Sequence, residues 1–266
     1  MSLESTPLFD IKELAESISM KFESKATPLL KISDEEGLKI YSGSYETTSF
    51  DGITIYDNKR FYIHLNTDRG NTIASVRGRF TLAHELGHYF IDTHRIGLKK
   101  GKLKPHPSYY NQEQYDRIEK EADYFASCLL MPEEKFLSDI YRKKFSPELI
   151  NQLCENYQVS KTACAIRFSL IGNHPIMVVY AEKGFIKWRK ASDDFPYKSL
   201  IKAKSVPENT VMGDYFADTN RDNTYKTEQV FASDWFYTYS KDDYRRKFYE
   251  YCISSGSNAL SILWED

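Results

Sequence analysis

Hydrophobic residues change their spacing several times along this chain, and each change marks a different element. Apolar residues recur at helical intervals between Phe9 and Ile18, which predicts an amphipathic first helix that ends near Pro28. Residues 53–65 then alternate between apolar and polar side chains on both sides of an Asp-Asn pair. Alternation of this kind around turn-forming residues predicts a β-hairpin.

The middle of the chain has helical spacing and the last third returns to alternation. From about Ser75 the pattern is helical for nearly a hundred residues, apart from a basic, proline-bearing loop over residues 97–107. Residues 175–191 contain two β-rich runs around a Glu-Lys-Gly turn, and residues 259–264 form an apolar run. We therefore expect two paired strands and a buried closing strand after the helical region.

These patterns predict an α+β fold with two domains. The spacing changes near residues 172–175, so we expect a mostly helical domain with a small β-sheet over residues 1–172 and a mixed α/β domain over residues 173–266. A length of 266 residues and a hydrophobic content of 41% are sufficient for real cores in both.

Charge and cysteine content narrow the class of protein. Thirty-six basic and 38 acidic residues give a net charge of −2, so the whole chain has no general attraction to nucleic acid or acidic membranes. The longest uncharged apolar-rich stretch, residues 168–181, is too short to span a bilayer, and the four cysteines form no CxxC pair. We expect a cytoplasmic protein that does not enter the membrane.

The strongest chemical signal is the segment FTLAHELGHYF, which contains His84, Glu85 and His88. Two histidines four residues apart on a helix lie one turn apart on one face, so both imidazoles can bind one Zn²⁺. Glu85 lies beside them and could accept a proton from water that the metal activates. We expect a hydrolytic zinc site with Glu85 as the catalytic residue; the alternative is a surface helix with two ordinary histidines.

A catalytic zinc needs a third protein ligand and one open position. His94 follows His88 at the spacing of the metzincins, but those proteins have glycine at the position of Ile91, where the helix breaks. In a continuous helix His94 would point about 240° away from His88. We expect His94 to lie at a helix end or behind the ligands, with ligation as the lesser alternative.

The next predicted helix, residues 114–132, offers better third ligands. Glu119 falls in a broad apolar stripe of this helix, whereas Glu121 falls at the edge of the polar face. A carboxylate in an apolar stripe is costly unless it is paired or binds a metal, so Glu119 is the predicted ligand and Glu121 the second choice. Asp123 could accept the outer N–H of a zinc-bound histidine, unless these acids form a solvated face.

Together these motifs resemble the ImmA/IrrE family of bacterial and phage zinc metallopeptidases. The resemblance rests on RFTLAHELGH and on EKEADYFASCLLMP about thirty residues later, and it extends to GITIYDNKRFYIHLN upstream and VSKTACAIRFSLIG downstream. It implies that His84, His88 and Glu119 bind zinc and that Glu85 is the acid/base catalyst. Asp123 stands where many family members have asparagine.

The resemblance also implies a function. Family members are cytosolic regulatory peptidases that cleave a partner helix-turn-helix repressor, often one encoded beside them, in responses to stress, DNA damage or phage. We therefore expect a zinc-dependent endopeptidase with a zincin-like first domain and a protein substrate. Residues 173–266 resemble, more loosely, the GAF-like sensor region of some members, which implies a regulatory domain and a small-molecule activator; a plain scaffold is the alternative.

Residues 146–172 have the pattern of a helix-turn-helix, with a serine-proline start and a break at residues 159–160. Its would-be recognition helix offers only Lys161 and Arg167 as cations, too few to neutralise several phosphates. We therefore favour a structural helix pair over a DNA-reading one.

The loop between the two metal-bearing helices is basic and aromatic. Four lysines over residues 99–104 usually indicate a solvated loop, although they could steer an acidic substrate or a nucleic-acid activator. His106, Tyr109 and Tyr110 are candidates for the group that stabilises an oxyanion.

Two other functions stay open at this point. A non-catalytic, zinc-stabilised DNA-binding regulator predicts that Glu85→Gln leaves the biological output intact and that the protein retards DNA. A digestive protease of the metzincin type predicts a secretion signal and loss of zinc on His94→Ala, and Ile91 argues against it.

Overall fold

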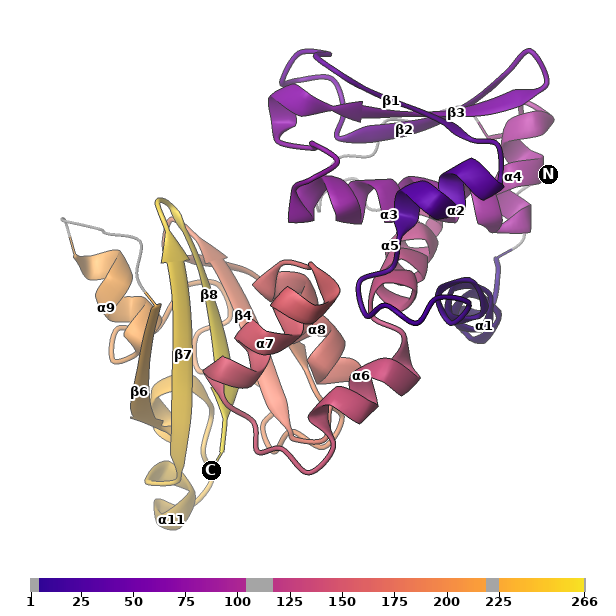
Figure 1. Ribbon diagram of the computed structural model, residues 1–266. Helices are drawn as coiled ribbons and strands as arrows, with labels where there is room; N and C mark the ends of the chain where they lie inside the picture. Colours follow the sequence, from indigo (N-terminus) through magenta and orange to yellow (C-terminus); the bar gives the residue numbers. More distant parts are fainter. Residues whose placement is uncertain (1–4, 104–116, 219–224, 266) are drawn as a thin grey trace. The chain divides into compact units, whose positions relative to one another are not determined.

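The computed structural model has the expected α+β architecture (Figure 1). It describes residues 5–103, 117–218 and 225–265, and within these ranges it contains eleven α-helices and two β-sheets. Contacts divide the chain into two compact units, Met1–Asp139 with Gln152–Ser160, and Ile140–Asn151 with Lys161–Asp266. Unlike the predicted domains, these units group the helix before residue 172 with the C-terminal strands.

The N-terminal part of the chain supplies most of the helices. Its elements are α1 (Leu8–Ser19), α2 (Leu29–Glu35), β1 (Lys39–Gly43), β2 (Gly52–Asp57), β3 (Arg60–Asn66), a short 3-10 helix (Thr67–Arg69), α3 (Val76–Phe90), α4 (Asp92–Lys99), α5 (Arg117–Leu130), α6 (Glu133–Ile140) and α7 (Pro147–Tyr157). The sheet has the order β1-β3-β2, with β1 parallel and β2 antiparallel to β3. Its buried residues Phe61, Ile63 and Leu65 alternate along β3, which leaves one face of the sheet to pack on α3.

The predicted hairpin is confirmed, with its turn one residue further along. Asn58 and Lys59 connect β2 to β3 and have φ values of 47° and 61°. Two consecutive left-handed residues form the type of turn whose twist suits a two-residue hairpin. The first helix differs from the prediction, because α1 ends at Ser19 and buries Ile11, Ala15 and Ile18 while Phe9 is 69% exposed.

The C-terminal part of the chain contains the second sheet. Its elements are α8 (Lys161–Ile171), β4 (Ile176–Glu182), β5 (Phe185–Ala191), α9 (Val211–Ala217), β6 (Tyr225–Phe231), α10 (Ala232–Trp235), α11 (Lys241–Tyr244), β7 (Lys247–Ser255) and β8 (Asn258–Trp264). The strands are antiparallel in the order β5-β4-β8-β7-β6. The paired strands β4 and β5 and the buried closing strand β8 therefore confirm the sequence prediction.

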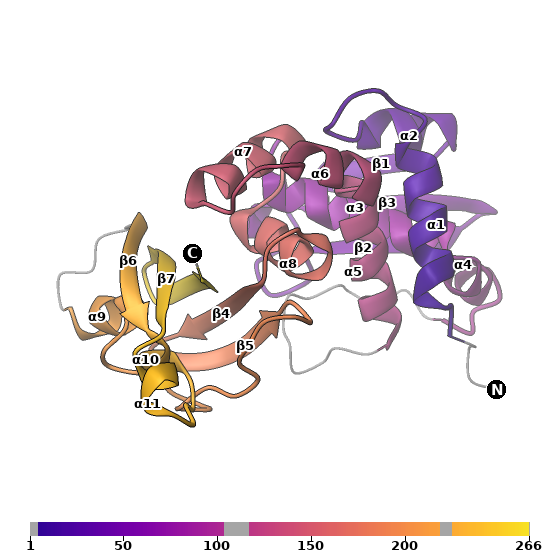
Figure 2. The same cartoon turned by 90° about the horizontal axis from the view of Figure 1, so that it is seen from below.

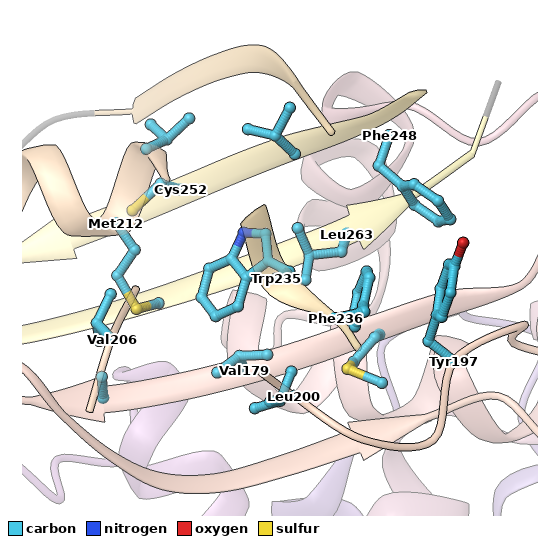
Figure 3. Packing of buried hydrophobic residues seen from close by; sticks show 14 of the residues in the cluster. Val179, Tyr197, Leu200, Val206, Met212, Trp235, Phe236, Phe248, Cys252 and Leu263 are labelled. Carbon is cyan, nitrogen blue, oxygen red and sulfur yellow. The ribbon is translucent and has the colours of Figure 1, made fainter. Parts of the chain in front are cut away.

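A dense apolar cluster covers one face of this second sheet. Figure 3 shows Trp235 and Phe236 between side chains of the strands and of the connecting segments, including Val179, Met212 and Leu263. Trp235 is completely buried. Because strands and connections share one core, the second unit has the close packing of a separate folding unit.

One acid lies inside this second unit. Glu250 of β7 is completely buried and accepts hydrogen bonds from the backbone N–H groups of Val211 (2.9 Å) and Met212 (3.0 Å). The Trp235 indole N–H (2.9 Å) and the Ser261 hydroxyl (2.5 Å) donate to the same carboxylate. Burial raises the pKa of Glu250, and the four donors act in the opposite direction.

The helix pair predicted over residues 146–172 is present as α7 and α8. The Ser146 hydroxyl accepts a hydrogen bond from the backbone N–H of Leu149 at 3.2 Å, as an N-cap should. Arg167 is only 1% exposed, so one of the two cations available for DNA reading is buried. None of the helices in the described ranges combines the length and the apolar composition of a membrane span.

Candidate metal centre

Helix α3 carries the histidine motif in its buried half. The Ser75 hydroxyl caps its first turn by accepting a hydrogen bond from the Gly78 backbone N–H at 2.9 Å. His84 and His88 are 5% and 4% exposed, which agrees with the semi-buried helix expected from the apolar residues around the motif. Both imidazoles are therefore sheltered from bulk water.

Helix α5 packs closely against α3 and supplies an acid to the two histidines (Figure 1). Gly87 makes the close approach possible, because a β-carbon there would lie 3.2 Å from the Cα of Ala122 on α5. Glu119, in the first turn of α5, thereby lies beside the two imidazoles.

The three side chains form a compact donor set. The Nε2 atoms of His84 and His88 are 3.2 Å apart, and the Glu119 carboxylate lies 3.2 Å from His84 Nε2 and 3.3 Å from His88 Nε2. Around a tetrahedral ion with bonds of about 2.0–2.1 Å, neighbouring ligand atoms are about 3.3–3.4 Å apart. The donor set therefore fits a divalent metal ion, and it is the only such group found within the described ranges.

The charges in this cluster suit a cation. Burial disfavours ionised Glu119, but hydrogen bonds and attraction from His84 and His88 lower its pKa well below the usual range. Burial likewise disfavours protonated His84, but Asp123 and Glu119 raise its pKa well above the usual value. The site thus concentrates negative charge around the imidazoles, as a metal site with mixed nitrogen and oxygen ligands requires.

Asp123 lies one turn beyond Glu119 on α5 and contacts the far side of the His84 ring. Its carboxylate is 2.7 Å from His84 Nδ1. A hydrogen bond there holds the proton on Nδ1 and leaves Nε2 free to bind a metal. The structure therefore brings together the four residues that the sequence predicted in or beside a metal site: His84, His88, Glu119 and Asp123.

Glu85 is completely buried and faces strand β2. The Thr54 hydroxyl lies 2.7 Å from its carboxylate oxygen Oε2 and 3.0 Å from its backbone oxygen. A β-carbon on Gly52 would lie 2.8 Å from Glu85 Oε1 and 2.6 Å from a methyl group of Thr81, so any larger residue would force these side chains or the strand to shift.

Asp51 anchors the start of this strand. Its buried carboxylate accepts hydrogen bonds from Arg77 (2.7 Å), Asn71 (2.9 Å) and Arg69 (3.1 Å). Asp51, Gly52 and Thr54 were missed in the sequence, where the only available signal was a glycine directly before an alternating strand.

Comparisons with known proteins agree with this geometry. Residues 54–169 match the family model described as "IrrE N-terminal-like domain", which belongs to a peptidase family. The match includes α3, α5 and every residue of the donor set. The chain therefore carries a metallopeptidase domain of the ImmA/IrrE family. The family resemblance of the sequence motifs is thus confirmed.

A solved structure gives a broader likeness of fold. The "Mycobacterium tuberculosis transcriptional regulator" is similar with a TM-score of 0.61 and 13% sequence identity, over 96% of this chain and 76% of that chain. At this identity the likeness concerns the fold alone. No curated protein sequence matches the chain.

Two predictions about the ImmA/IrrE-type domain were wrong. Glu121 does not lie at the edge of a polar face; it is 4% exposed, and its carboxylate is 2.9 Å from Nε2 of His94. Nor does α3 continue past Ile91, because that residue is extended, with ψ at 113°, and α4 starts directly after it. This break brings the His94 ring to 5.2 Å from the His88 ring, where it packs behind the donor set with Glu121.

His106, Tyr109 and Tyr110, proposed as oxyanion donors, lie outside the described residues. Of the basic loop, Lys99, Lys100 and Lys102 are described and exposed.

Proposed function

We propose that the ImmA/IrrE-type domain is a zinc-dependent endopeptidase with His84, His88 and Glu119 as ligands and Glu85 as acid/base catalyst. The observation that supports this most directly is the donor set, with its spacing of 3.2–3.3 Å on two helices inside the matched domain. Two histidines and one glutamate leave the fourth position of a tetrahedral zinc open for chemistry.

Several side chains of the protein would have separate roles in the reaction. Zn²⁺ bound here would polarise a peptide carbonyl and make water a better nucleophile. Glu85 would accept the proton of the attacking water and then donate it to the leaving amine. The Thr54 hydroxyl would fix the Glu85 carboxylate, and Asp123 would hold His84 with Nε2 towards the metal.

The proposed substrate is a partner protein in the cytoplasm, a helix-turn-helix repressor whose cleavage relieves repression during stress, DNA damage or phage attack. Family resemblance supports this substrate, and site geometry does not select it. We propose the C-terminal unit as a GAF-like regulatory domain. An antiparallel sheet with its own core and connecting helices supports a separate regulatory unit.

The function is tested by mixing the purified protein with a helix-turn-helix repressor encoded beside its gene. Wild type should bind about one zinc and produce defined fragments. Glu85→Gln should keep the zinc and cleave at least about 100-fold more slowly, because it removes the proton acceptor. Cleavage by Glu85→Gln at the wild-type rate would exclude Glu85 as catalyst. If repression were relieved to the same extent although no fragments formed, the result would support the non-catalytic regulator instead.

A further inference from the structure

The C-terminal unit has a concentration of positive charge that the whole-chain total conceals. Between residues 183 and 204 there are seven exposed cations and two acids, although the whole chain has a net charge of −2. The cations are Lys183, Lys187, Arg189, Lys190, Lys198, Lys202 and Lys204. We refer to these seven residues as the basic ribbon.

The basic ribbon is formed by the edge strand β5, with Lys183 in the turn before it, and by the return segment that follows β5, residues 192–206 (Figure 2). The backbone N–H of Ile186 donates to the Lys204 carbonyl at 2.8 Å, and that of Val206 donates to the Gly184 carbonyl at 3.0 Å. Further along, the Arg189 guanidinium donates to the Lys198 carbonyl at 3.1 Å. The hydrogen bonds hold both segments side by side, so their cations lie on one edge of the sheet.

Little of this charge is neutralised by neighbouring acids. Within the described part of the chain, ion pairs with ribbon residues involve Lys187 with Glu182 at 3.7 Å and Lys202 with Glu208 at 3.2 Å. All four side chains are substantially exposed, and pairs of this kind contribute little free energy. An external polyanion could therefore replace both acids at small cost.

The ribbon also exposes apolar surface beside its cations. Phe185 is 60% exposed at the start of β5, next to the hydrogen-bonded Lys204 segment, and Ile201 is 39% exposed. Further along the strand, Trp188 is half-buried and stacks on Tyr180 with ring centroids 5.3 Å apart. An exposed ring among cations is the combination with which proteins bind single-stranded nucleic acid, because every base can stack on it.

We propose that the basic ribbon is a binding site for single-stranded nucleic acid, with phosphates along the cations and a base stacked on Phe185. Alternate residues of a strand are about 6.6 Å apart, so Lys187 and Arg189 of β5 present charge at a regular spacing along a line, as a linear polyanion does. A membrane surface presents its charge as a plane. Duplex DNA is read by an element that enters a groove, which a sheet edge with a packed return segment does not supply. This site does not depend on the proposed peptidase activity.

The test uses the full-length protein and a fluorescein-labelled oligothymidine of about 20 nucleotides, followed by fluorescence anisotropy. Affinity should fall between about 50 and 200 mM salt, with a logarithmic slope of about −2 to −3 if three or four phosphates are neutralised. The double variant Lys202→Glu/Lys204→Glu should bind at least about tenfold more weakly and with a smaller slope. Phe185→Ala should weaken binding about fivefold or more through lost stacking.

The matched control is Lys21→Glu/Lys39→Glu, which makes the same change of charge at exposed positions of the first unit. It should bind as wild type does. Circular dichroism should report native folding for both doubles, because all four lysines are exposed. Absence of salt-dependent binding, or equal loss in both doubles, would overturn the proposal. So would a ribbon double that loses binding only to vesicles with about 30% phosphatidylserine, since that result identifies a membrane surface.

Discussion

Glu250 in the second unit is completely buried, Glu119 in the first unit has a side chain that is only 13% exposed, and the two acids are satisfied in opposite ways. Glu250 in the second unit is surrounded by four hydrogen-bond donors, two from the backbone and two from side chains. Glu119 in the first unit faces two imidazole Nε2 atoms, which can donate only when they carry a proton. Burial alone therefore does not distinguish a structural acid from a ligand; the nature of the neighbouring groups does.

The contrast has a physical basis. Donors that are fixed by the backbone satisfy a carboxylate permanently, so Glu250 joins α9, α10 and β8 to β7. The imidazole of His84, which Asp123 orients, and the imidazole of His88 present lone pairs to the same point as the Glu119 carboxylate. The polar atoms of this donor set are all satisfied only when a cation lies between them.

The largest expected effect is the loss of zinc affinity when Glu119 is removed. Glu119→Ala should weaken zinc binding by more than about 100-fold. Mutation of a residue that only hydrogen-bonds to a metal ligand costs up to about 100-fold in affinity, and removal of a direct ligand should cost more. Competition with a chelating dye measures this affinity. Glu208→Ala, at a side chain that is 89% exposed, should bind zinc as wild type does. Wild-type affinity in Glu119→Ala would break the comparison, because both acids would then be structural.

The reciprocal change is Glu250→Gln. Removal of the charge relieves desolvation, but the new NH₂ group faces donors, so we expect a net loss of about 2 kcal/mol in the free energy of unfolding. Urea unfolding measures it, with Glu208→Gln as a control expected within about 0.5 kcal/mol of wild type. Zinc content should not change. Stability equal to the control would contradict the anchoring role of Glu250.

A smaller effect is expected at Thr54, provided that the proposed peptidase function holds. Thr54→Val keeps the shape but removes the hydroxyl beside Glu85, and kcat should fall about tenfold with KM and zinc content nearly unchanged. Thr54→Ser should restore kcat because it retains the donor. A loss that serine does not restore would assign Thr54 a packing role only.

The smallest effect concerns alkaline pH and the second unit alone. Burial and then Asp243, which accepts the phenol hydrogen bond, together raise the pKa of Tyr197 to about 12, and Arg246 acts in the opposite direction. A raised pKa means that Tyr197 stabilises the fold below pH 10 and that this contribution is lost as pH rises to about 12. Tyr197→Phe should remove about 1 kcal/mol near neutral pH and flatten this alkaline loss in urea unfolding. An unchanged alkaline slope would exclude Tyr197 as its source.

Local pattern was enough for the elements and for much of the site. The helical spacing of residues 114–132 separated Glu119 from the solvent-facing positions, and the four-residue spacing of His84 and His88 set them on one face. The hairpin followed from alternation and a turn pair. These features depend on residues close in sequence, so a single segment contains the necessary information.

The errors arose where a second element decides the environment. A helical wheel for α5 alone places Glu121 near the polar face, because it cannot include His94 from α4. The break at Ile91 uses an extended conformation that any residue can adopt, so the missing glycine was misleading. Glu250 had no local signal either, since its four donors come from α9, α10 and β8.

The close packing at Gly52 limits the substitutions that natural variants can carry at this position. Any mutation of the Gly52 codon that changes the amino acid adds at least one carbon, and that carbon would meet the Glu85 carboxyl group at 2.8 Å. Such a mutation would disturb the orientation of Glu85 more than it would disturb strand β2. As long as selection maintains that acid, natural variants should keep this position fixed while the exposed turn at Asn58 drifts.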